Sequence, residues 1–387
     1  MKDMKSLLSS FTDKDVDNKK RIALYIWLGV AVFTIVQSLI THRYNNYLIF
    51  ENTVRNLFQQ TSLYDVYPKY HFDTNHYGPI FSVFFMPFSV FPTPIGFAIW
   101  NLFTTVFLFK AIDTLPLKDK TPLYFIAIPC LVSSCLSQQS NPLIGAFIIL
   151  SYTLLNKNKG LWSSLFIMLG TFIKLYGIVG LSLFFFVKDK KRFIGYLLMW
   201  SVILLVVPMF FSSPTYILNS YSEWAISLSQ KNAHNIIESS IDISIMGFIR
   251  HLFDNPKLPN LEFLIGGALV FLIPYLNFKR FENQKFQLLI LASTLLFPVL
   301  FSTGAEDCTY IIAIPAVGIW YLTTEPRKWK AYLVGAVVFF SCNFPQFIYH
   351  KVALRYPISL TILSLPFFIV WLLIIYDAYQ LKNTSYA

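Results

Sequence analysis

Charged side chains are scarce in this sequence. Only 13% of its 387 residues are Asp, Glu, Lys or Arg, whereas 55% are hydrophobic. Soluble globular domains carry roughly 25% charged residues, so the composition argues against a soluble globular protein. Acidic residues are the scarcer kind, with 20 Asp and Glu against 31 Lys and Arg and a net charge of +11. The composition predicts a protein whose surface faces lipid.

The excess of positive charge does not form one basic patch. Lys and Arg occur in short clusters between apolar runs, which is the arrangement found in the loops of membrane proteins. A nucleic-acid-binding surface gathers its basic residues on one face or along one helix. We therefore expect no nucleic-acid partner.

Cysteine is also rare, and the common motifs of soluble enzymes are missing. The four cysteines, at positions 130, 135, 308 and 342, do not have metal-ligand spacing. The sequence contains no Walker loop, no dinucleotide-binding glycine fingerprint, no zincin pair and no GxSxG motif. Chemistry driven by ATP or a nucleotide sugar is therefore not expected, and a lipid-borne substrate presented from the bilayer fits better.

Long apolar runs are what the sequence has in abundance. The first, residues 22–40, follows a charged stretch without a cleavage site and predicts a retained transmembrane helix. Together the runs predict an all-α, polytopic integral membrane protein with about twelve transmembrane segments, some of them short or broken. The runs are residues 22–40, 79–113, 122–136, 141–155, 161–173, 176–187, 193–211, 262–277, 286–302, 309–322, 331–349 and 357–377.

Residues 79–113 decide the topology. If they cross once, with PIFSVFFMPFSVFP re-entrant or interfacial, all basic clusters lie in the cytoplasm, as the positive-inside rule requires. Two crossings would invert every later loop. We prefer the single crossing, which gives a cytoplasmic N-terminal tail (1–21), one transmembrane domain (22–377) and a cytoplasmic C-terminal tail (378–387). The basic clusters are the N-terminal tail and residues 118–120, 156–159, 188–192, 277–285 and 326–330.

The remaining loops fall on the outer side and carry most of the polar residues. The two longest, 41–78 and 212–261, exceed what a plain connection needs, which favours a functional role. In the first, the apolar spacing of residues 47–58 predicts an amphipathic helix along the membrane surface. In the second, SYSEWAISL and ISIMGFIRHLF predict similar helices. The shorter outer loops are 137–141, the turn around Lys174, 304–308 and 350–355.

Lys174 interrupts the apolar segment GTFIKLYGIVGLSLFFF. A lysine near the bilayer centre costs about 2.5–3.5 kcal/mol on insertion scales. The topology instead places Lys174 at the outer end of two short helices, where its ammonium can hold a lipid phosphate. Gln139 and Asn141 lie in a neighbouring outer turn. They form either an ordinary polar turn or hydrogen-bonding groups for a substrate, and the residues alone leave both readings open.

Four segments in order, NNYLIFENTVRNLFQQTSLYDVYP, HYGPIFSVFFMPF, SQQSN and GTFIKLYGIVGL, resemble bacterial members of glycosyltransferase family 87. The resemblance continues to ISIMG and, more weakly, through AEDCTYIIA. It implies a GT-C fold and an enzyme of the cytoplasmic membrane. Such an enzyme moves a monosaccharide from a polyprenyl-phosphate donor to a lipid-linked or cell-envelope glycan acceptor on the extracytoplasmic face, with inversion. Membrane lipids are its other partners.

The resemblance also implies roles for individual residues. Lys174 matches the family's lysine and is expected to bind the donor phosphate. The family commonly has a proline shortly after it, where this chain has Gly177. Gln139 and Asn141 match the family's QxN motif. The substrate-binding candidates are Asn46, Tyr77, Gln139 and Asn141.

This chain departs from the family pattern at the general base. The resemblance implies a carboxylate in the first outer loop, but where the family often has Asp this chain has Asn46. An amide cannot accept a proton at neutral pH. Asp73 is our first substitute for the base, followed by Glu51 and Glu306. His76 is a base in principle, although a histidine in a loop is more often a hydrogen-bonded surface residue.

Two other functions stay open. The lysine within apolar sequence and the glycine-interrupted short helices suit a lipid-carrier transporter or flippase, although the two halves show no internal repeat. The Asn46 departure suits a non-catalytic glycolipid-binding protein. No structural metal is expected and no cofactor is certain. A divalent cation bound by two outer carboxylates stays open.

Overall fold

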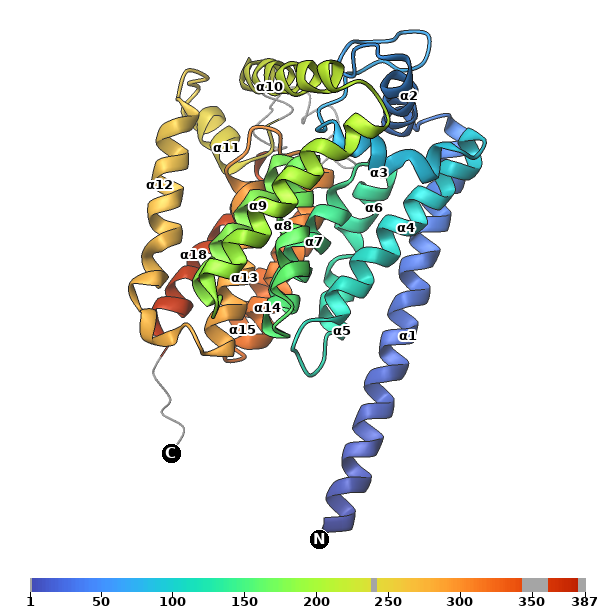
Figure 1. Cartoon of the computed structure of the whole chain (residues 1–387). Coiled ribbons are helices and arrows are strands. Elements are labelled where there is room, and N and C mark those ends of the chain that lie inside the picture. Colours follow the sequence, from blue (N-terminus) through green and yellow to red (C-terminus); the bar gives the residue numbers. More distant parts are fainter. Residues whose placement is uncertain (1, 238–241, 343–360, 382–387) are drawn as a thin grey trace.

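The computed structural model describes residues 2–237, 242–342 and 361–381, and every regular element in these ranges is a helix (Figure 1). This confirms the predicted all-α class. The predicted outer loop at 350–355 and residues 382–387 of the predicted C-terminal tail lie outside the described ranges.

In chain order, the described ranges contain α-helices and shorter 3₁₀ helices. The α-helices are α1 (Lys2–Thr41), α2 (Asn45–Gln59), α3 (Ile80–Ser89), α4 (Thr93–Asp113), α5 (Thr121–Ile126), α6 (Ile128–Ser137), α7 (Asn141–Asn156), α8 (Gly160–Ile173), α9 (Lys190–Val206), α10 (Pro214–Ile237), α11 (Ile245–Leu252), α12 (Asn260–Leu272), α13 (Gln284–Leu300), α14 (Tyr310–Thr323), α15 (Lys328–Ser341) and α18 (Ser364–Gln380). The 3₁₀ helices are η1 (Leu175–Phe186), η2 (Val207–Phe210), η3 (Ile273–Leu276), η4 (Phe278–Arg280) and η5 (Asp307–Thr309).

Among the described residues, three helices are long and apolar enough to cross a membrane. They are Asp15–Thr41 within α1, Thr93–Asp113 and Lys190–Phe210. The other apolar helices found in the described ranges have 10–17 residues, whereas a straight crossing needs about 20. Short helices of this kind were expected, but the count of about twelve crossings stays a prediction.

Residues 79–113 form one short helix and one long helix. The ten residues of α3 measure about 15 Å at 1.5 Å per residue, roughly half the hydrocarbon thickness of a bilayer. The 21 residues of α4 are long enough to span. The break lies at Pro92, which is extended (φ −51°, ψ 138°) and disfavours helical geometry in the residue before it. The segment thus contains one helix of spanning length, which is what the single-crossing topology requires.

Aromatic side chains anchor α2 onto α3 and α4. The ring centroid of Phe50 lies 4.8 Å from that of Phe81, and the centroid of Phe85 lies 5.0 Å from that of Trp100. All four rings are buried. Edge-to-face pairs of this kind add about 0.5–1.5 kcal/mol each beyond the area they bury. The helix predicted at 47–58 therefore exists as α2 and contributes one face to the core.

α13 and α14 occupy the centre of the bundle. Every residue of α14 from Tyr310 to Trp320 is buried, and a helix that is apolar on all sides must be covered by other helices. α7, α13 and α18 all pack against α14. The turn 304–309 precedes α14 and carries Glu306. The centre of the fold thus fixes the position of this turn.

α2 and α10 lie at one end of the molecule, opposite α5 and α15 (Figure 1). Hydrogen bonds tie α10 to the loop between α2 and α3: Trp224 Nε1 donates to the His76 carbonyl at 2.9 Å, and the Tyr216 hydroxyl donates to the Thr61 carbonyl at 2.6 Å. Helices predicted in the second outer loop are thereby confirmed as α10 and α11. The loop 60–79 and α10 form one layer over the end of the bundle.

Candidate functional site

Lys174 occupies a sharp turn between α8 and η1. Its backbone is extended (φ −147°, ψ 114°) between α8, which ends at Ile173, and η1, which begins at Leu175. The two helices can meet closely because glycines face each other. A Cβ on Gly177 would lie 2.3 Å from the backbone carbon of Gly170. Lys174 therefore stands at the end of two helices, as predicted, and the departure at Gly177 has a packing reason.

The Lys174 ammonium has neutral neighbours. Nζ donates to Oδ1 of Asn141 at 2.7 Å. It also lies 4.9 Å from the ring centroid of Tyr176 and 5.8 Å from that of Tyr77, within the range of cation–π attraction. In the described ranges no carboxylate oxygen lies within 4.0 Å of Nζ. The positive charge thus remains available to an anionic ligand.

The QxN turn links this lysine to a carboxylate. Gln138 takes the left-handed conformation (φ 53°) after α6, and Asn141 begins α7. Asn141 Nδ2 donates to Gln139 Oε1 at 3.0 Å, and Gln139 Nε2 donates to Glu306 Oε2 at 3.0 Å. The three hydrogen bonds from Lys174 to Glu306 all run in the same direction, which fixes the orientation of both amides.

Glu306 belongs to the turn before α14. Its side chain and that of Thr309 form a capping box on η5, the Glu306 N–H donating to Thr309 Oγ1 at 3.1 Å. A carboxylate at this position also interacts favourably with the N-terminal end of the helix that follows. Glu306 is therefore held both by its own turn and by Gln139.

A cavity of about 250 Å³ opens beside Lys174. The loop 60–79, α2, α10 and the turn 302–306 surround it. Six of the eight residues expected at the site line it: Asn46, Asp73, Tyr77, Gln139, Lys174 and Glu306. Asn141 is fully buried and does not line the cavity itself. Its hydrogen bonds hold two lining side chains, Lys174 and Gln139, in place.

Glu51 lies apart from this cavity. Both of its carboxylate oxygens are 3.2 Å from the Thr93 hydroxyl, which donates to them at the first residue of α4. Burial raises the pKa of Glu51, while Thr93 and Arg55 oppose that effect. Glu51 is not among the residues that line this cavity. Of the three carboxylates considered as base, the fold brings only Asp73 and Glu306 to the lysine's cavity.

Asn46 and Tyr77 have defined partners within the cavity wall. Asn46 Nδ2 donates to the Ser137 carbonyl at 2.7 Å, at the last residue of α6. The Tyr77 ring stacks on Phe81 with centroids 4.5 Å apart, and its hydroxyl accepts from the Ser140 N–H at 3.4 Å. The next residue, Gly78, also binds the neighbouring turn: its N–H donates to the Ile173 carbonyl at 3.1 Å. The loop 60–79 is thus fastened directly beside the Lys174 turn.

α10 supplies cavity residues that the sequence analysis missed. Leu228, Lys231, Asn232 and Asn235 all line the cavity. Their spacing of three, one and three residues is that of one helix face, so a helical reading extended beyond SYSEWAISL would have found them. Asn235 Nδ2 donates to the Thr303 carbonyl at 2.9 Å. These residues bring a second ammonium, that of Lys231, to the cavity.

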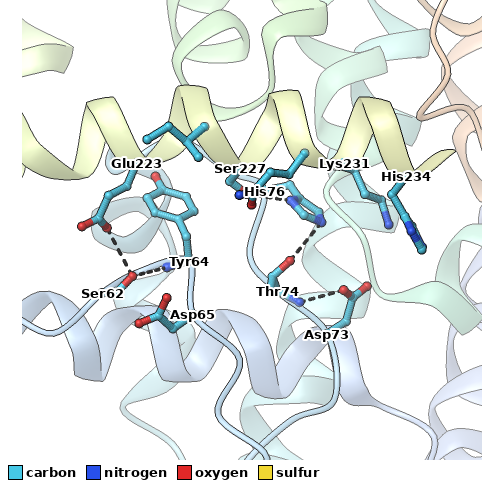
Figure 2. A pocket seen from close by; sticks show the side chains of 12 residues that line it. Ser62, Tyr64, Asp65, Asp73, Thr74, His76, Glu223, Ser227, Lys231 and His234 are labelled. Carbon is cyan, nitrogen blue, oxygen red and sulfur yellow. Dashed lines mark hydrogen bonds between the residues drawn. The ribbon is translucent and has the colours of Figure 1, made fainter. Parts of the chain in front are cut away.

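A second, larger cavity of about 640 Å³ adjoins the first. Figure 2 shows it between α10 and the loop 62–76, with Lys231 and His234 reaching down from the helix near Asp73. The two cavities share four lining residues, which are Asp73, Thr74, His76 and Lys231. These four form the boundary between the two spaces.

His76 is neutral at this boundary. Its Nδ1 lies 3.0 Å from Ser227 Oγ and its Nε2 lies 3.3 Å from Thr74 Oγ1. Burial lowers the pKa of His76 to about 4; the Lys231 charge acts in the same direction, and Asp73 opposes it. At pH 7 the imidazole can therefore exchange hydrogen bonds but adds no positive charge.

The described residues contain no group of three His, Cys, Asp or Glu side chains suited to hold a metal ion. Two carboxylates, those of Asp73 and Glu306, line the smaller cavity. In enzymes Mg²⁺ is commonly bound by one or two carboxylates of the protein together with phosphate oxygens of the substrate. A divalent cation here would therefore draw on these two side chains together with a ligand phosphate.

Comparison with known proteins agrees with this geometry. A family model described as Glycosyltransferase family 87 matches residues 75–303, which is more than half of the chain. The matched segment includes Tyr77, the QxN turn, Lys174 and α10, whereas Asp73 and Glu306 fall just outside it. No curated protein matches the chain. The lysine turn, the cavity beside it and this match lead to one conclusion: the chain belongs to glycosyltransferase family 87.

Proposed function

We propose that this membrane glycosyltransferase takes a monosaccharide from a polyprenyl-phosphate donor and passes it, with inversion, to a lipid-linked or cell-envelope glycan acceptor. The reaction would take place on the extracytoplasmic face of the bacterial cytoplasmic membrane. The observation that carries the proposal is the Lys174 ammonium, which lines a cavity at the end of apolar helices and has no carboxylate within 4.0 Å among the described residues.

A lipid phosphate suits this ammonium better than a soluble anion does. Lys174 stands between two apolar helices, so a ligand that reaches it can keep its hydrocarbon chain in the bilayer. When the sugar leaves, the phosphate gains negative charge, and a fixed cation stabilises that charge most strongly where water is scarce. Lys174 would therefore bind the donor and stabilise the leaving group. Lys231 would add a second positive charge at the other wall of the cavity.

Asp73 is the better placed of the two carboxylates to act as general base. It lines both cavities, and within the described ranges only the Thr74 N–H donates to its carboxylate, at 2.7 Å. Glu306 is occupied by the bond from Gln139 and by its capping box. A base needs a free oxygen within reach of the acceptor hydroxyl. We assign Asp73 as the base and Glu306 as the group that orients Gln139.

The bond changes follow from these roles. The acceptor oxygen forms a bond to the anomeric carbon from the face opposite the phosphate, while the bond from that carbon to the phosphate oxygen breaks. The acceptor proton moves to the Asp73 carboxylate. The electron pair of the broken bond remains on the phosphate, next to Lys174. A single displacement of this kind inverts the anomeric configuration, and Asn46, Tyr77 and Gln139 would orient the sugar.

The interior of the bundle favours transfer over transport. A transport pathway needs polar groups along its length, whereas α14 is apolar and buried from Ile311 to Trp320 at the centre of the bundle. The cavity residues gather at one end, beneath α10. This arrangement suits a site reached from the outer face and from the bilayer. A measurement of turnover distinguishes the transferase from the alternative, a non-catalytic glycolipid-binding protein.

Sugar transfer in membranes tests the proposal. Membranes from expressing cells would receive a panel of radiolabelled polyprenyl-phosphate sugars, and labelled product would be counted for the wild type and for Lys174→Met. Loss of a preorganised charge partner lowers turnover by about 10²–10³-fold. Lys188→Met is the matched control, because Lys188 is an exposed lysine at the far end of η1.

Two results would overturn the assignment. Undiminished transfer by Lys174→Met would remove the phosphate-holding role of Lys174. Tight binding of a polyprenyl-phosphate sugar without turnover, in membranes that contain the acceptor, would favour the glycolipid-binding protein. The cation would be examined in the same assay by EDTA treatment followed by addition of Mg²⁺ or Mn²⁺, because Asp73 and Glu306 can supply carboxylate ligands next to the phosphate.

A further inference from the structure

The larger cavity differs from the smaller one in charge. Three carboxylates line it, those of Asp65, Asp73 and Glu223, whereas its one ammonium, that of Lys231, lies on the boundary shared with the smaller cavity. In the smaller cavity two ammoniums, those of Lys231 and Lys174, balance the two carboxylates of Asp73 and Glu306. A phosphate placed among three carboxylates would be repelled, and repulsion between like charges is strong where water is partly excluded. The two cavities are therefore suited to different ligands.

The larger cavity is also lined by the imidazoles of His76 and His234 and by neutral hydrogen-bonding side chains. Ser62, Thr74, Ser227 and Gln230 supply hydroxyl and amide groups, and Ile226 is the aliphatic residue. Sugar hydroxyls donate to carboxylates in charge-assisted hydrogen bonds, which are roughly twice as strong as neutral ones. The volume of about 640 Å³ lies within the range of about 300–1,000 Å³ typical of small-molecule sites. The lining thus matches a polyhydroxylated ligand without negative charge.

The walls of this cavity are fixed to each other. Ser62 Oγ donates to Glu223 Oε2 at 3.2 Å, and Ser227 Oγ donates to the Asn75 carbonyl at 3.2 Å. Each bond joins the loop 60–79 to α10, and Figure 2 shows the bond between Ser62 and Glu223. The carboxylate of Glu223 is thereby oriented before any ligand arrives, which reduces the ordering cost of binding.

We propose that the larger cavity is the acceptor subsite and that it selects a glycan end bearing hydroxyls and no phosphate. This assignment rests on the proposed transferase function, since it divides donor and acceptor between the two cavities. Asp73 belongs to both linings, so a hydroxyl held in the larger cavity approaches the base directly. The donor phosphate stays with Lys174, on the far side of the boundary.

Two cysteine reporters on α10 test whether donor and acceptor bind in different cavities. Ile226 lines the larger cavity and Leu228 lines the smaller one. Ile226→Cys and Leu228→Cys would be made separately in a Cys342→Ser background, because Cys342 is exposed whereas the other native cysteines are buried. The purified full chain in lipid nanodiscs would be labelled with a maleimide in the presence of polyprenyl phosphate, neutral methyl glycosides or their 6-phosphates.

Each ligand has an expected pattern. Polyprenyl phosphate should slow labelling of Leu228→Cys and leave Ile226→Cys unchanged. Neutral methyl glycosides should slow labelling of Ile226→Cys, and their 6-phosphates should not. The subsite assignment is overturned if polyprenyl phosphate protects both cysteines equally, if the 6-phosphates protect as well as the neutral sugars, or if no glycoside protects. Failure of polyprenyl phosphate to protect Leu228→Cys, with glycoside protection intact, would contradict the proposed donor instead.

Variants of the carboxylates test whether these groups bind the sugar hydroxyls. Glu223→Gln, made in the Ile226→Cys background, should raise the glycoside concentration needed for half protection by about tenfold, the effect of losing one hydrogen bond to a charged group. Asp65→Asn should act in the same direction, and Glu262→Gln, an exposed glutamate on α12, should have no effect. Unchanged protection in both Glu223→Gln and Asp65→Asn would refute the role of the carboxylates. The same substitutions in the Leu228→Cys background should leave protection by polyprenyl phosphate intact, which shows that the variants fold.

Discussion

Lys174 Nζ donates a hydrogen bond to Oδ1 of Asn141 at 2.7 Å, although 33 residues separate them in the chain. Asn141 is fully buried and uses its amide group to hold Gln139 as well. The amide thus positions the ammonium but does not neutralise its charge. A carboxylate partner would neutralise it. This is the arrangement that a site for a phosphate needs, because the charge is oriented and yet available.

Asn141→Leu should weaken catalysis without removing the lysine. The substitution deletes the acceptor of the Lys174 bond and the donor to Gln139 while filling a similar volume. We expect kcat/KM for transfer to fall by about tenfold or more, since a hydrogen bond to a charged group contributes about 1.5–3 kcal/mol. Asn156→Leu, at the exposed opposite end of α7, is the control. Equal activity of the two variants would show that Asn141 does not position Lys174.

The two cavity carboxylates should differ in their effect on turnover. Asp73→Asn removes the proposed base and should lower kcat by about 10²–10⁴-fold. Glu306→Gln leaves Gln139 a neutral partner and should cost only about tenfold. Steady-state transfer rates at matched protein levels measure both, with the exposed Glu325→Gln as control. The reverse order of effects would assign the base to Glu306.

Gly177→Ala should destabilise the fold. The added Cβ would lie 2.3 Å from the backbone of Gly170 and Thr171, so α8 and η1 would have to move apart at a cost of about 1–3 kcal/mol. Gly195→Ala in α9 is the control, because nothing lies within 4 Å of the new methyl group. That control should be neutral or stabilising by about 0.5–1 kcal/mol. Thermal unfolding in detergent distinguishes the two, and equal midpoints would contradict the close approach of the helices.

His76 should make stability depend on pH. Its pKa of about 4 in the folded protein lies below the value of about 6.5 expected in the unfolded chain. Between these values the unfolded state binds the extra proton, so the stabilising contribution is complete above about pH 6.5 and is lost as pH falls toward 4. The slope reaches at most about 1.4 kcal/mol per pH unit.

The measurement is the unfolding midpoint between pH 7.5 and 4.5. His76→Gln keeps a hydrogen-bonding side chain but cannot titrate, so its midpoint should fall less steeply than that of the wild type. His42→Gln changes an exposed histidine and should keep the wild-type slope. Identical slopes for wild type and His76→Gln would show that His76 does not remain neutral at the cavity boundary.

Local patterns determined much of this protein from the sequence. Hydrophobic runs broken by Pro, Gly and charged clusters were enough to predict an all-helical chain, the helix of the first outer loop and the turn at Lys174. Helix formation depends on neighbours three and four residues apart, and that information is present in any short stretch. The same logic would have extended α10 to Lys231 and Asn235.

Tertiary structure alone decided which polar groups meet. Gln139 and Glu306 are 167 residues apart and still form a 3.0 Å hydrogen bond, while Glu51, a neighbour of Asn46 in sequence, turns to Thr93 instead. Contacts of this kind depend on how buried helices pack, and no periodicity along the chain encodes them. The sequence determined that a lysine would lie at the turn between two short helices. The packing of α2, α10, α14 and the Lys174 turn decided that it would face a cavity shared with Asp73 and Glu306.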